Sequence, residues 1–368
     1  MNELATDIAR RIAERGPLPF AAYMSIALYD PVHGYYSTEP RTGWRGQFVT
    51  SPELDPAFGS LWATGAQEVW DRCGRPENFV VVEIGPGEGS FADAVLDATT
   101  GRFGDALRYI LVERTAAGRR RQATRIADPR TDWVAALDEL ETVPAGMVVA
   151  NEVIDNLPFH IVERHGDELI ELYVGVNVDG NLVEIEGDPS TPELALFLER
   201  HGMTLDDGHR AEVSLATEGF VRQAAGVIER GSVVLIDYGA MGEDLALRPR
   251  GTLACYSAAG VDDLPLDEPG TKDITAHGNW SAVMHSLAAM QVIGPRPQAD
   301  VLRALGAAAL DTELEAVHAR ALEEGRGADA VAALSRRQAL RVLLDPGGLG
   351  GLDVVVGLRG IDPPPFLA

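Results

Sequence analysis

Short apolar runs alternate with helix-like stretches from about residue 79 onward. Four of the runs have the length of buried strands, and they cover residues 79–84, 108–113, 147–152 and 232–237. Helical patterns over 90–98 and 114–125 follow the first two runs, and a last apolar run lies at 352–357. Buried strands that alternate with helices are typical of an open parallel sheet. The pattern predicts an α/β fold.

The N-terminal part has a different pattern. Leu4, Ile8 and Ile12 lie on one face of a predicted helix over 3–15, which the Gly-Pro-rich residues 16–19 end. The aromatic-rich segment that follows, residues 20–44, predicts an irregular cap or a small helix and loop.

Three later regions interrupt the sheet pattern. Residues 161–186 predict two short hairpins, 240–280 predict long loops, and 297–343 predict helices. We expect one domain with insertions rather than two domains. Its predicted parts are an N-terminal helix and cap over 1–75 and a main domain over 76–368, with insertions at about 160–230 and 240–280.

Composition narrows the class of protein. Of the 368 residues, 46% are hydrophobic and 24% charged, which excludes wholesale disorder. No window reaches the ~18 apolar residues of a membrane helix, and the charged N-terminus lacks the apolar core of a secretory signal. Cys73 and Cys255 are the only cysteines, so a disulfide framework is excluded and a reducing, cytoplasmic location is expected.

The charge balance indicates the kind of partner. Asp and Glu outnumber Lys and Arg by 56 to 31, which leaves a net charge of −25. Nucleic-acid binders need basic surface, so this class is disfavoured. An acidic field favours cationic ligands or basic peptides, although the charge is equally explained by solubility alone.

A glycine loop follows the first strand. Gly85, Gly87 and Gly89 lie between the strand at 79–84 and the helix at 90–98, where the backbone can approach a nucleotide-like ligand. The dinucleotide pattern G-x-G-x-x-G/A requires Gly or Ala at position 90, and Ser90 stands there. An ordinary strand–helix turn is the alternative.

Two acidic residues favour a cationic nucleotide ligand. Glu83 precedes the loop, where a carboxylate suits the sulfonium and ammonium groups of S-adenosylmethionine better than a pyrophosphate. Glu113 ends the next strand, where an acid accepts hydrogen bonds from ribose hydroxyls.

Polar residues also follow the later strands. Asn151, Glu152, Asp155 and Asn156 come after the third strand, and Asp237 ends the fourth. The carboxyl ends of sheet strands border the ligand crevice, so these side chains are candidates for a site. Capping of a turn or helix is the alternative for Asp155, Asn156 and Asp237.

An ordered set of short motifs carries a family resemblance. In chain order the motifs are Pro19-Phe20, Tyr23-Met24, Ala27-Leu28-Tyr29-Asp30-Pro31, Gly34-Tyr35-Tyr36, Phe48-Val49-Thr50-Ser51-Pro52-Glu53, Glu83-Ile84-Gly85-Pro86-Gly87-Glu88-Gly89, Asn151-Glu152, Asp155-Asn156-Leu157-Pro158, Asp237-Tyr238-Gly239, Gly251-Thr252-Leu253, Asp273-Ile274-Thr275-Ala276-His277 and Leu344-Asp345-Pro346. Together they resemble the MidA-like methyltransferases, which include relatives of a mitochondrial complex I assembly factor.

The resemblance implies a class I S-adenosylmethionine-dependent methyltransferase: a Rossmann-like sheet of seven strands, the last antiparallel, with an N-terminal cap and hairpin and helical insertions. The mitochondrial member of the family methylates protein arginine. The most favoured activity is therefore protein arginine N-methylation of a partner protein. A small-molecule O- or N-methyltransferase and a catalytically silent assembly factor that binds the cofactor are the alternatives. The family also suggests a homodimer.

Matching these motifs to the family's pattern implies which residues of this chain form the site. The cofactor-binding residues so implied are Glu83, Gly85, Pro86, Gly87, Gly89, Glu113, Asn151, Ser51 and Pro52. The implied catalytic acids are Glu53, Glu152 and Asp155. The family pattern changes at Gln47, Asn156 and Gly278-Asn279, all where the acceptor is expected. A lone histidine is more often structural than catalytic, so His277 is expected to be structural. The tyrosines at 23–36 predict a packed lid rather than an aromatic cage. No metal site is expected.

Overall fold

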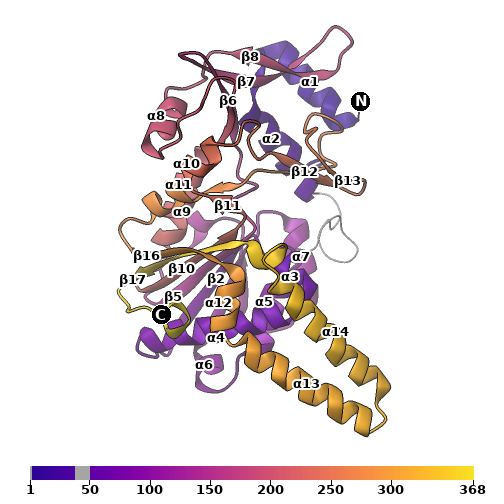
Figure 1. Cartoon of the computed structure of the whole chain (residues 1–368), viewed down its shortest axis with the longest axis vertical. Coiled ribbons are helices and arrows are strands. Elements are labelled where there is room, and N and C mark those ends of the chain that lie inside the picture. Colours follow the sequence, from indigo (N-terminus) through magenta and orange to yellow (C-terminus); the bar gives the residue numbers. More distant parts are fainter. Residues whose placement is uncertain (1, 38–49) are drawn as a thin grey trace.

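The computed structural model describes residues 2–37 and 50–368. Its largest sheet has seven strands (Figure 1). In spatial order they are β16 (Gln291–Pro297), β17 (Asp353–Arg359), β10 (Gly231–Asp237), β5 (Gly146–Asn151), β2 (Phe79–Ile84), β3 (Leu107–Val112) and β4 (Thr131–Val134). Neighbouring strands are parallel except at β17, which is antiparallel to both β10 and β16. The predicted seven-stranded sheet with an antiparallel last strand is confirmed.

Helices cover both faces of this sheet. One face packs against α4 (Ala57–Arg72), α5 (Ser90–Ala98), α6 (Gly101–Ala106) and α12 (Gln298–Ala304). The other packs against α9 (Ala216–Gly226) and α11 (Trp280–Ser286). The strands are buried on both faces, which explains why they are continuous apolar runs in the sequence.

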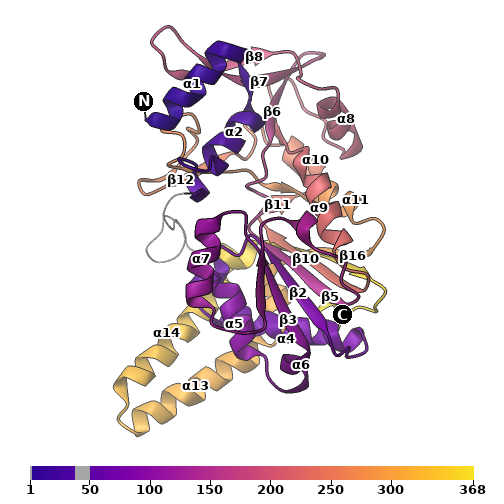
Figure 2. The same ribbon diagram turned by 180° about the vertical axis from the view of Figure 1, so that it is seen from behind.

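A second sheet lies above the first in Figures 1 and 2. It contains β1 (Leu18–Pro19), β7 (Glu168–Val176), β6 (His160–His165), β9 (Arg210–Val213) and β8 (Leu182–Gly187). One face packs against α1 (Glu3–Arg15) and α2 (Phe20–Tyr29), and the other against α8 (Glu193–Arg200) and α10 (Gly242–Ala246). The two predicted hairpins over 161–186 are confirmed as β6–β7 and β7–β8.

The region 240–280 is more ordered than the predicted long loops. It holds two small sheets: β11 (Gly239–Ala240) pairs with β15 (Gly278–Asn279), and β12 (Ala254–Ser257) pairs with both β13 (Gly260–Asp262) and β14 (Asp273–Thr275). These strands are only two to four residues long, too short for a period-2 pattern to reveal them.

The remaining elements are helical. They are α3 (Ser51–Leu54), α7 (Ala116–Arg125), α13 (Ala307–Glu323), α14 (Gly327–Leu343) and the 3₁₀ turns η1 (Tyr35–Ser37), η2 (Leu137–Glu139), η3 (Leu349–Gly351) and η4 (Pro365–Leu367). The helix α13–α14 hairpin projects from the body (Figure 1). Across residues 2–37 and 50–368, no helix is long and apolar enough to cross a membrane.

Some element boundaries predicted from the sequence differ from the observed ones by one or two residues. Other predicted positions lie outside the residues that the structure describes. The strand predicted at 108–113 spans Leu107–Val112, and the helix predicted at 114–125 begins at Ala116. Helix α4 and strands β4 and β16 were not predicted. The family-motif residues Phe48 and Val49, and the departure at Gln47, lie outside the described residues. The division at residues 75 and 76 stays a prediction.

Candidate active site

A cavity of about 1110 Å³ opens at the carboxyl ends of β2, β3 and β5. Its lining also includes residues of α2, η1 and β14, so it lies between the main sheet and the upper part of the molecule. Ligands of open α/β sheets bind at this edge, where loops connect strands to helices. All but Gly89 and Ser51 of the predicted site residues line the cavity.

The glycine loop forms part of the cavity wall. Gly85 and Gly87 have φ angles of 68° and 53°, a conformation that favours glycine. A side chain at Gly85 would meet Val153 at 2.8 Å, whereas a Cβ at Gly87 would enter open space. Pro86 lines the cavity between them. Gly89 instead precedes α5 with a φ of 83° and does not line the cavity, and a side chain there would meet Ile126 at 3.0 Å.

Glu83 is 5% exposed and reaches the cavity beneath the loop. The Tyr109 hydroxyl donates a hydrogen bond of 2.8 Å to its Oε2. Burial raises the pKa of Glu83 to about 8, although this hydrogen bond opposes the shift, and the Glu53 charge adds to it. Glu53 accepts a 2.6 Å hydrogen bond from the Ser90 hydroxyl at the start of α5. The structure therefore brings Glu53 beside Glu83 and the glycine loop.

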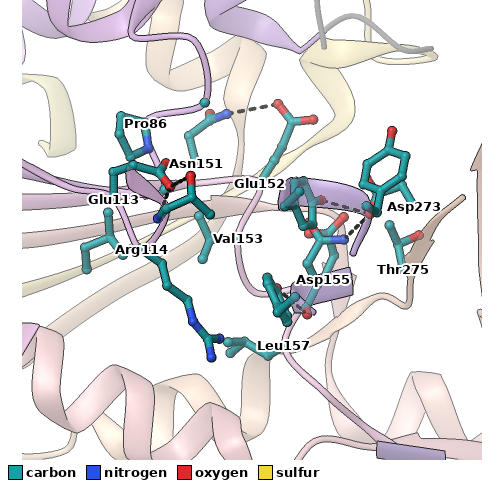
Figure 3. A pocket seen from close by; sticks show the side chains of 18 of the residues that line it. Pro86, Glu113, Arg114, Asn151, Glu152, Val153, Asp155, Leu157, Asp273 and Thr275 are labelled. Carbon is teal, nitrogen blue, oxygen red and sulfur yellow. Dashed lines mark hydrogen bonds between the residues drawn. The ribbon is translucent and has the colours of Figure 1, made fainter. Parts of the chain in front are cut away.

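Glu113 follows β3 and lines the same cavity (Figure 3). Its Oε1 accepts hydrogen bonds of 2.7 Å from both the N–H and the hydroxyl of Thr115. The Gln122 amide donates to Glu113 Oε2 at 3.2 Å and to the Gly87 carbonyl at 2.8 Å. Gln122 thus joins the acid to the glycine loop. Gln122 was not predicted as a site residue; the signal for it is a polar residue on the buried side of α7.

Glu152 follows β5 with a φ of 53°, which is unusual for a residue other than glycine. Its Oε1 accepts hydrogen bonds from the Asn151 amide (2.9 Å) and the Ser51 N–H (3.4 Å). Burial raises the pKa of Glu152 to about 8. Asn151 Oδ1 is buried and has no hydrogen-bond partner in the part of the chain that the structure describes. Ser51 lies behind the wall, where its hydroxyl accepts from Gln298 at 3.0 Å.

Asp237 holds the turn that carries these residues. Its Oδ2 accepts the N–H groups of Val153 (3.1 Å), Ile154 (2.8 Å) and Asp155 (3.2 Å). Its Oδ1 accepts the N–H of Tyr238 at 2.8 Å. Burial raises the pKa of Asp237 to about 7 although these four donors oppose the shift. Asp237 is fully buried and absent from the cavity wall, so the structure favours its capping role.

Asp155 points into the cavity from the same turn (Figure 3). Burial and the neighbouring Asp237 carboxyl hold the pKa of Asp155 well above its usual range, and the charges of Asp273 and Glu152 act in the same direction. Its Oδ1 is buried without a hydrogen-bond partner among the described residues. An unpaired buried oxygen of this kind is costly unless a ligand satisfies it.

Asp273, at the start of β14, forms a network that the sequence analysis did not anticipate. Its Oδ1 accepts hydrogen bonds from the Tyr36 hydroxyl (2.8 Å) and the Asn156 amide (2.9 Å). The Tyr29 hydroxyl donates to the Asn156 carbonyl at 3.0 Å. Burial raises the pKa of Asp273 to about 7. The network joins the N-terminal segment to the β5 turn and lines the cavity.

Aromatic and cationic groups complete the lining. Burial lowers the pKa of His277, whose Nδ1 is buried without a partner in the described part of the chain and whose ring stacks on Tyr238 at 6.3 Å. The Arg114 guanidinium lies over the Tyr29 ring at 5.3 Å. No cluster of His, Cys, Asp and Glu among residues 2–37 and 50–368 could hold a metal ion.

The fold and the cavity define a class of protein. A sheet with this strand order, a glycine loop after β2 and an acid after β3 are those of class I S-adenosylmethionine-dependent methyltransferases. Solved structures agree: a protein of Burkholderia thailandensis bound to S-adenosyl-homocysteine is 29% identical, with a TM-score of 0.87 over 99% of this chain and 94% of its own. A native crystal structure from the same organism gives a TM-score of 0.83 at 28% identity, over 99% and 93%.

Residues 61–296 match the family described as "Putative S-adenosyl-L-methionine-dependent methyltransferase", and the chain belongs to this family. A relative in Drosophila melanogaster, "Protein arginine methyltransferase NDUFAF7 homolog, mitochondrial", is 30% identical over 77% of this chain and 70% of its own length. The protein arginine methyltransferase NDUFAF7 of Xenopus tropicalis is 26% identical over 83% and 76%. The resemblance to the MidA-like methyltransferases, the fold and the cofactor are confirmed.

The predicted location in the cell is wrong. The relatives in Drosophila melanogaster, Xenopus tropicalis and Danio rerio are named as mitochondrial proteins, which contradicts the cytoplasmic location expected from the sequence. A scarcity of cysteine indicates a reducing environment and does not distinguish the cytosol from another reducing compartment.

Proposed function

We propose that this methyltransferase modifies arginine side chains of a partner protein. The observation that carries the proposal is the set of three carboxyl groups around one end of the cavity: Asp273, which is buried, and Glu152 and Asp155, which are half-buried and have raised pKa values. A cationic acceptor complements them, because buried acids are stabilised in their ionised form by an opposite charge. The names of the relatives in Drosophila and Xenopus support the same acceptor.

The residues at the other end of the cavity fit S-adenosylmethionine. We assign the open space at Gly87, together with Gly85 and Pro86, to its methionine portion and Glu113 to its ribose hydroxyls. The buried, unpartnered Asn151 Oδ1 offers a further acceptor for a donor group of the cofactor. When bound, S-adenosylmethionine supplies an electrophilic methyl group on a sulfonium. Glu83 provides negative charge for the cationic groups that accompany it.

The acids on the acceptor side have a separate task. A guanidinium is protonated at any physiological pH and is a poor nucleophile. Glu152 and Asp155 orient it through charge-assisted hydrogen bonds, and one of them holds the proton that the nitrogen loses. A cation between them favours their ionised forms and so prepares them to accept this proton. We assign Glu53 to the cofactor side, because its contacts are with Ser90 and the Glu83 charge.

The sequence left two alternative functions open besides protein arginine methylation. A small-molecule N- or O-methyltransferase would use the same cofactor residues, and the aromatic lining that Tyr29 and Tyr36 provide is compatible with a small acceptor. A silent cofactor-binding assembly factor is disfavoured by the intact Glu152 and Asp155. The expected homodimer and the expected lack of nucleic-acid and membrane partners stay predictions.

Two measurements test the proposal. Calorimetry with S-adenosyl-homocysteine should show binding by the purified chain, and NADH serves as the negative control. Transfer of labelled methyl groups from S-adenosylmethionine to lysate proteins and to a small-molecule extract then separates the acceptors. We expect the label on protein arginine. Label confined to small molecules would support the alternative enzyme, and cofactor binding without transfer would support the silent factor.

A further inference from the structure

The carboxyl groups at the acceptor end come from two different parts of the molecule. Glu152 and Asp155 follow β5 of the main sheet, whereas Asp273 begins β14 of a small sheet in the upper part. Figure 3 shows all three on the side of the pocket away from Pro86 and Glu113. Each side of the cavity therefore contributes carboxyl groups to the same end, which a cationic ligand would favour in their ionised form.

Asp273 is held in place before any acceptor arrives. It is 2% exposed, and the Tyr36 hydroxyl and Asn156 amide both donate to its Oδ1. These donors come from η1 and from the β5 turn, so two segments other than its own fix this carboxyl group. A rigid, preorganised group loses little conformational freedom when it binds a ligand.

These acids lack a protein counter-ion. In the part of the chain that the structure describes, no ion pair joins Glu152, Asp155 or Asp273 to a cationic side chain. Asp155 Oδ1 also lacks any hydrogen-bond partner there. Buried acids without a cation are expensive, and they are retained at sites where a ligand provides the charge.

We propose that Asp273 is a specificity-determining residue, which with Asp155 binds the cationic side chain of the acceptor and selects it over a neutral side chain of the same shape. The inference rests on the proposed arginine methyltransferase function. Asp155 is supplied by the catalytic turn and Asp273 by the upper part, so the acceptor is held between the two. Asn156, which departs from the family pattern, acts through Asp273 as a positioning residue.

Citrulline tests this selection because it has the shape of arginine without the charge. The probes are a peptide of three Gly-Arg-Gly repeats as the substrate and its citrulline counterpart as a competitor only, because a ureido nitrogen is not a methyl acceptor. The preference is the ratio of the citrulline Ki to the arginine KM. The test variant is Asp273→Asn, whose Oδ1 still accepts from Tyr36 and Asn156 while the negative charge is removed. We expect the KM for the arginine peptide to rise at least about tenfold, the loss of one charge-assisted hydrogen bond. The preference for arginine over citrulline should fall by a similar factor, with kcat less affected.

Two further variants separate charge from structure. Tyr36→Phe removes one hydrogen bond to Asp273 but keeps its charge, so we expect the arginine preference to persist. Glu212→Gln is the matched control: Glu212 is a half-buried acid that is absent from the cavity wall, and it accepts the N–H groups of Leu253 and of Thr252, of which Thr252 lines the cavity. We expect it to leave the preference unchanged. Binding of S-adenosyl-homocysteine verifies that each variant is folded.

The outcomes distinguish this inference from the proposed function. If the wild-type protein does not prefer arginine to citrulline, the proposed arginine acceptor is wrong. If the wild type prefers arginine and folded Asp273→Asn retains the full preference, the role of Asp273 is overturned and the proposed function stands. A loss of preference equally large in Glu212→Gln would also overturn it, since an acid absent from the cavity wall would then suffice.

Discussion

The backbone conformation of Glu152 is imposed by the strands that surround it. Its left-handed backbone costs on the order of 1–3 kcal/mol for a residue other than glycine. The Glu152 N–H donates to the Ile236 carbonyl at 2.8 Å, and Asp237 accepts the next three N–H groups, so two strands impose the turn. The turn directs the Glu152 and Asp155 carboxyls into the cavity. Strain maintained in this way is typical of functional sites.

The first prediction concerns the charge of Glu152. Glu152→Gln keeps the size of the side chain but removes its ability to hold a proton, so we expect kcat for arginine methylation to fall by about 100-fold or more. The affinity for S-adenosyl-homocysteine, measured by calorimetry, should change little. Glu186→Gln, on the exposed part of β8, is the control and should retain full activity. Near-normal turnover in Glu152→Gln would remove Glu152 from the catalytic acids.

At the scale of the element, the β2–α5 loop depends on backbone that approaches a ligand. Gly87 and Gly101 both have positive φ angles, 53° and 60°, and a Cβ at either would meet no protein atom within 4 Å. Only Gly87 lines the cavity. The pair therefore separates the cost of the backbone conformation from the cost of occupying the space of the cofactor.

The second prediction uses this pair. Gly87→Ala and Gly101→Ala should each lower the free energy of unfolding by about 1 kcal/mol, the cost of the left-handed conformation for alanine. Only Gly87→Ala should weaken binding of S-adenosyl-homocysteine, by about tenfold or more, because its methyl group enters the space proposed for the cofactor. Chemical denaturation and calorimetry measure the two quantities. Equal affinities in the two variants would show that the cofactor does not approach Gly87.

At the scale of the whole molecule, acids are buried where the two parts meet. The pKa values are about 8 for Glu83 and Glu152 and about 7 for Asp273, against 4.5 and 3.8 for ordinary Glu and Asp. Burial is the main cause at each position. Each group binds its proton more tightly in the folded than in the unfolded state. Its contribution to stability is complete below the unfolded pKa and is lost as the pH rises through the folded pKa.

The third prediction follows from the raised pKa values of these acids in the folded protein. Without ligand, the free energy of unfolding should fall from about pH 4.5 to about pH 8 and level off above that, because over this range the unfolded acids have ionised while the folded ones still hold their protons. Urea denaturation across this range measures the fall. Glu83→Gln should reduce the slope by up to about 1.4 kcal/mol per pH unit, the contribution of one proton. Stability that is constant or rises over this range would show that these acids are ionised in the free protein.

Local patterns in the chain were sufficient for five strands of the main sheet and for its glycine loop, but not for β4 and β16. The strands β2, β3, β5 and β10 are largely buried on both faces, so each is a nearly continuous apolar run. Glycines with positive φ mark the turn after β2, and acids mark the strand ends. The short strands of residues 239–279 were missed because two to four residues carry no period. The helix α4 was also missed; ten of its sixteen residues are buried, so its exposed polar face is narrow.

The amino-acid sequence by itself determined the class of fold, the cofactor loop and the acids that follow the strands. These features arise from burial and backbone geometry over a few neighbouring residues, which a linear pattern records. Only the tertiary structure decided that Tyr36 and Asn156 meet Asp273, across sequence separations of 237 and 117 residues. The tertiary structure also places Ser51 behind the cavity wall and Glu53 beside Glu83. Such contacts depend on how whole sheets and helices pack, and no local pattern encodes that packing.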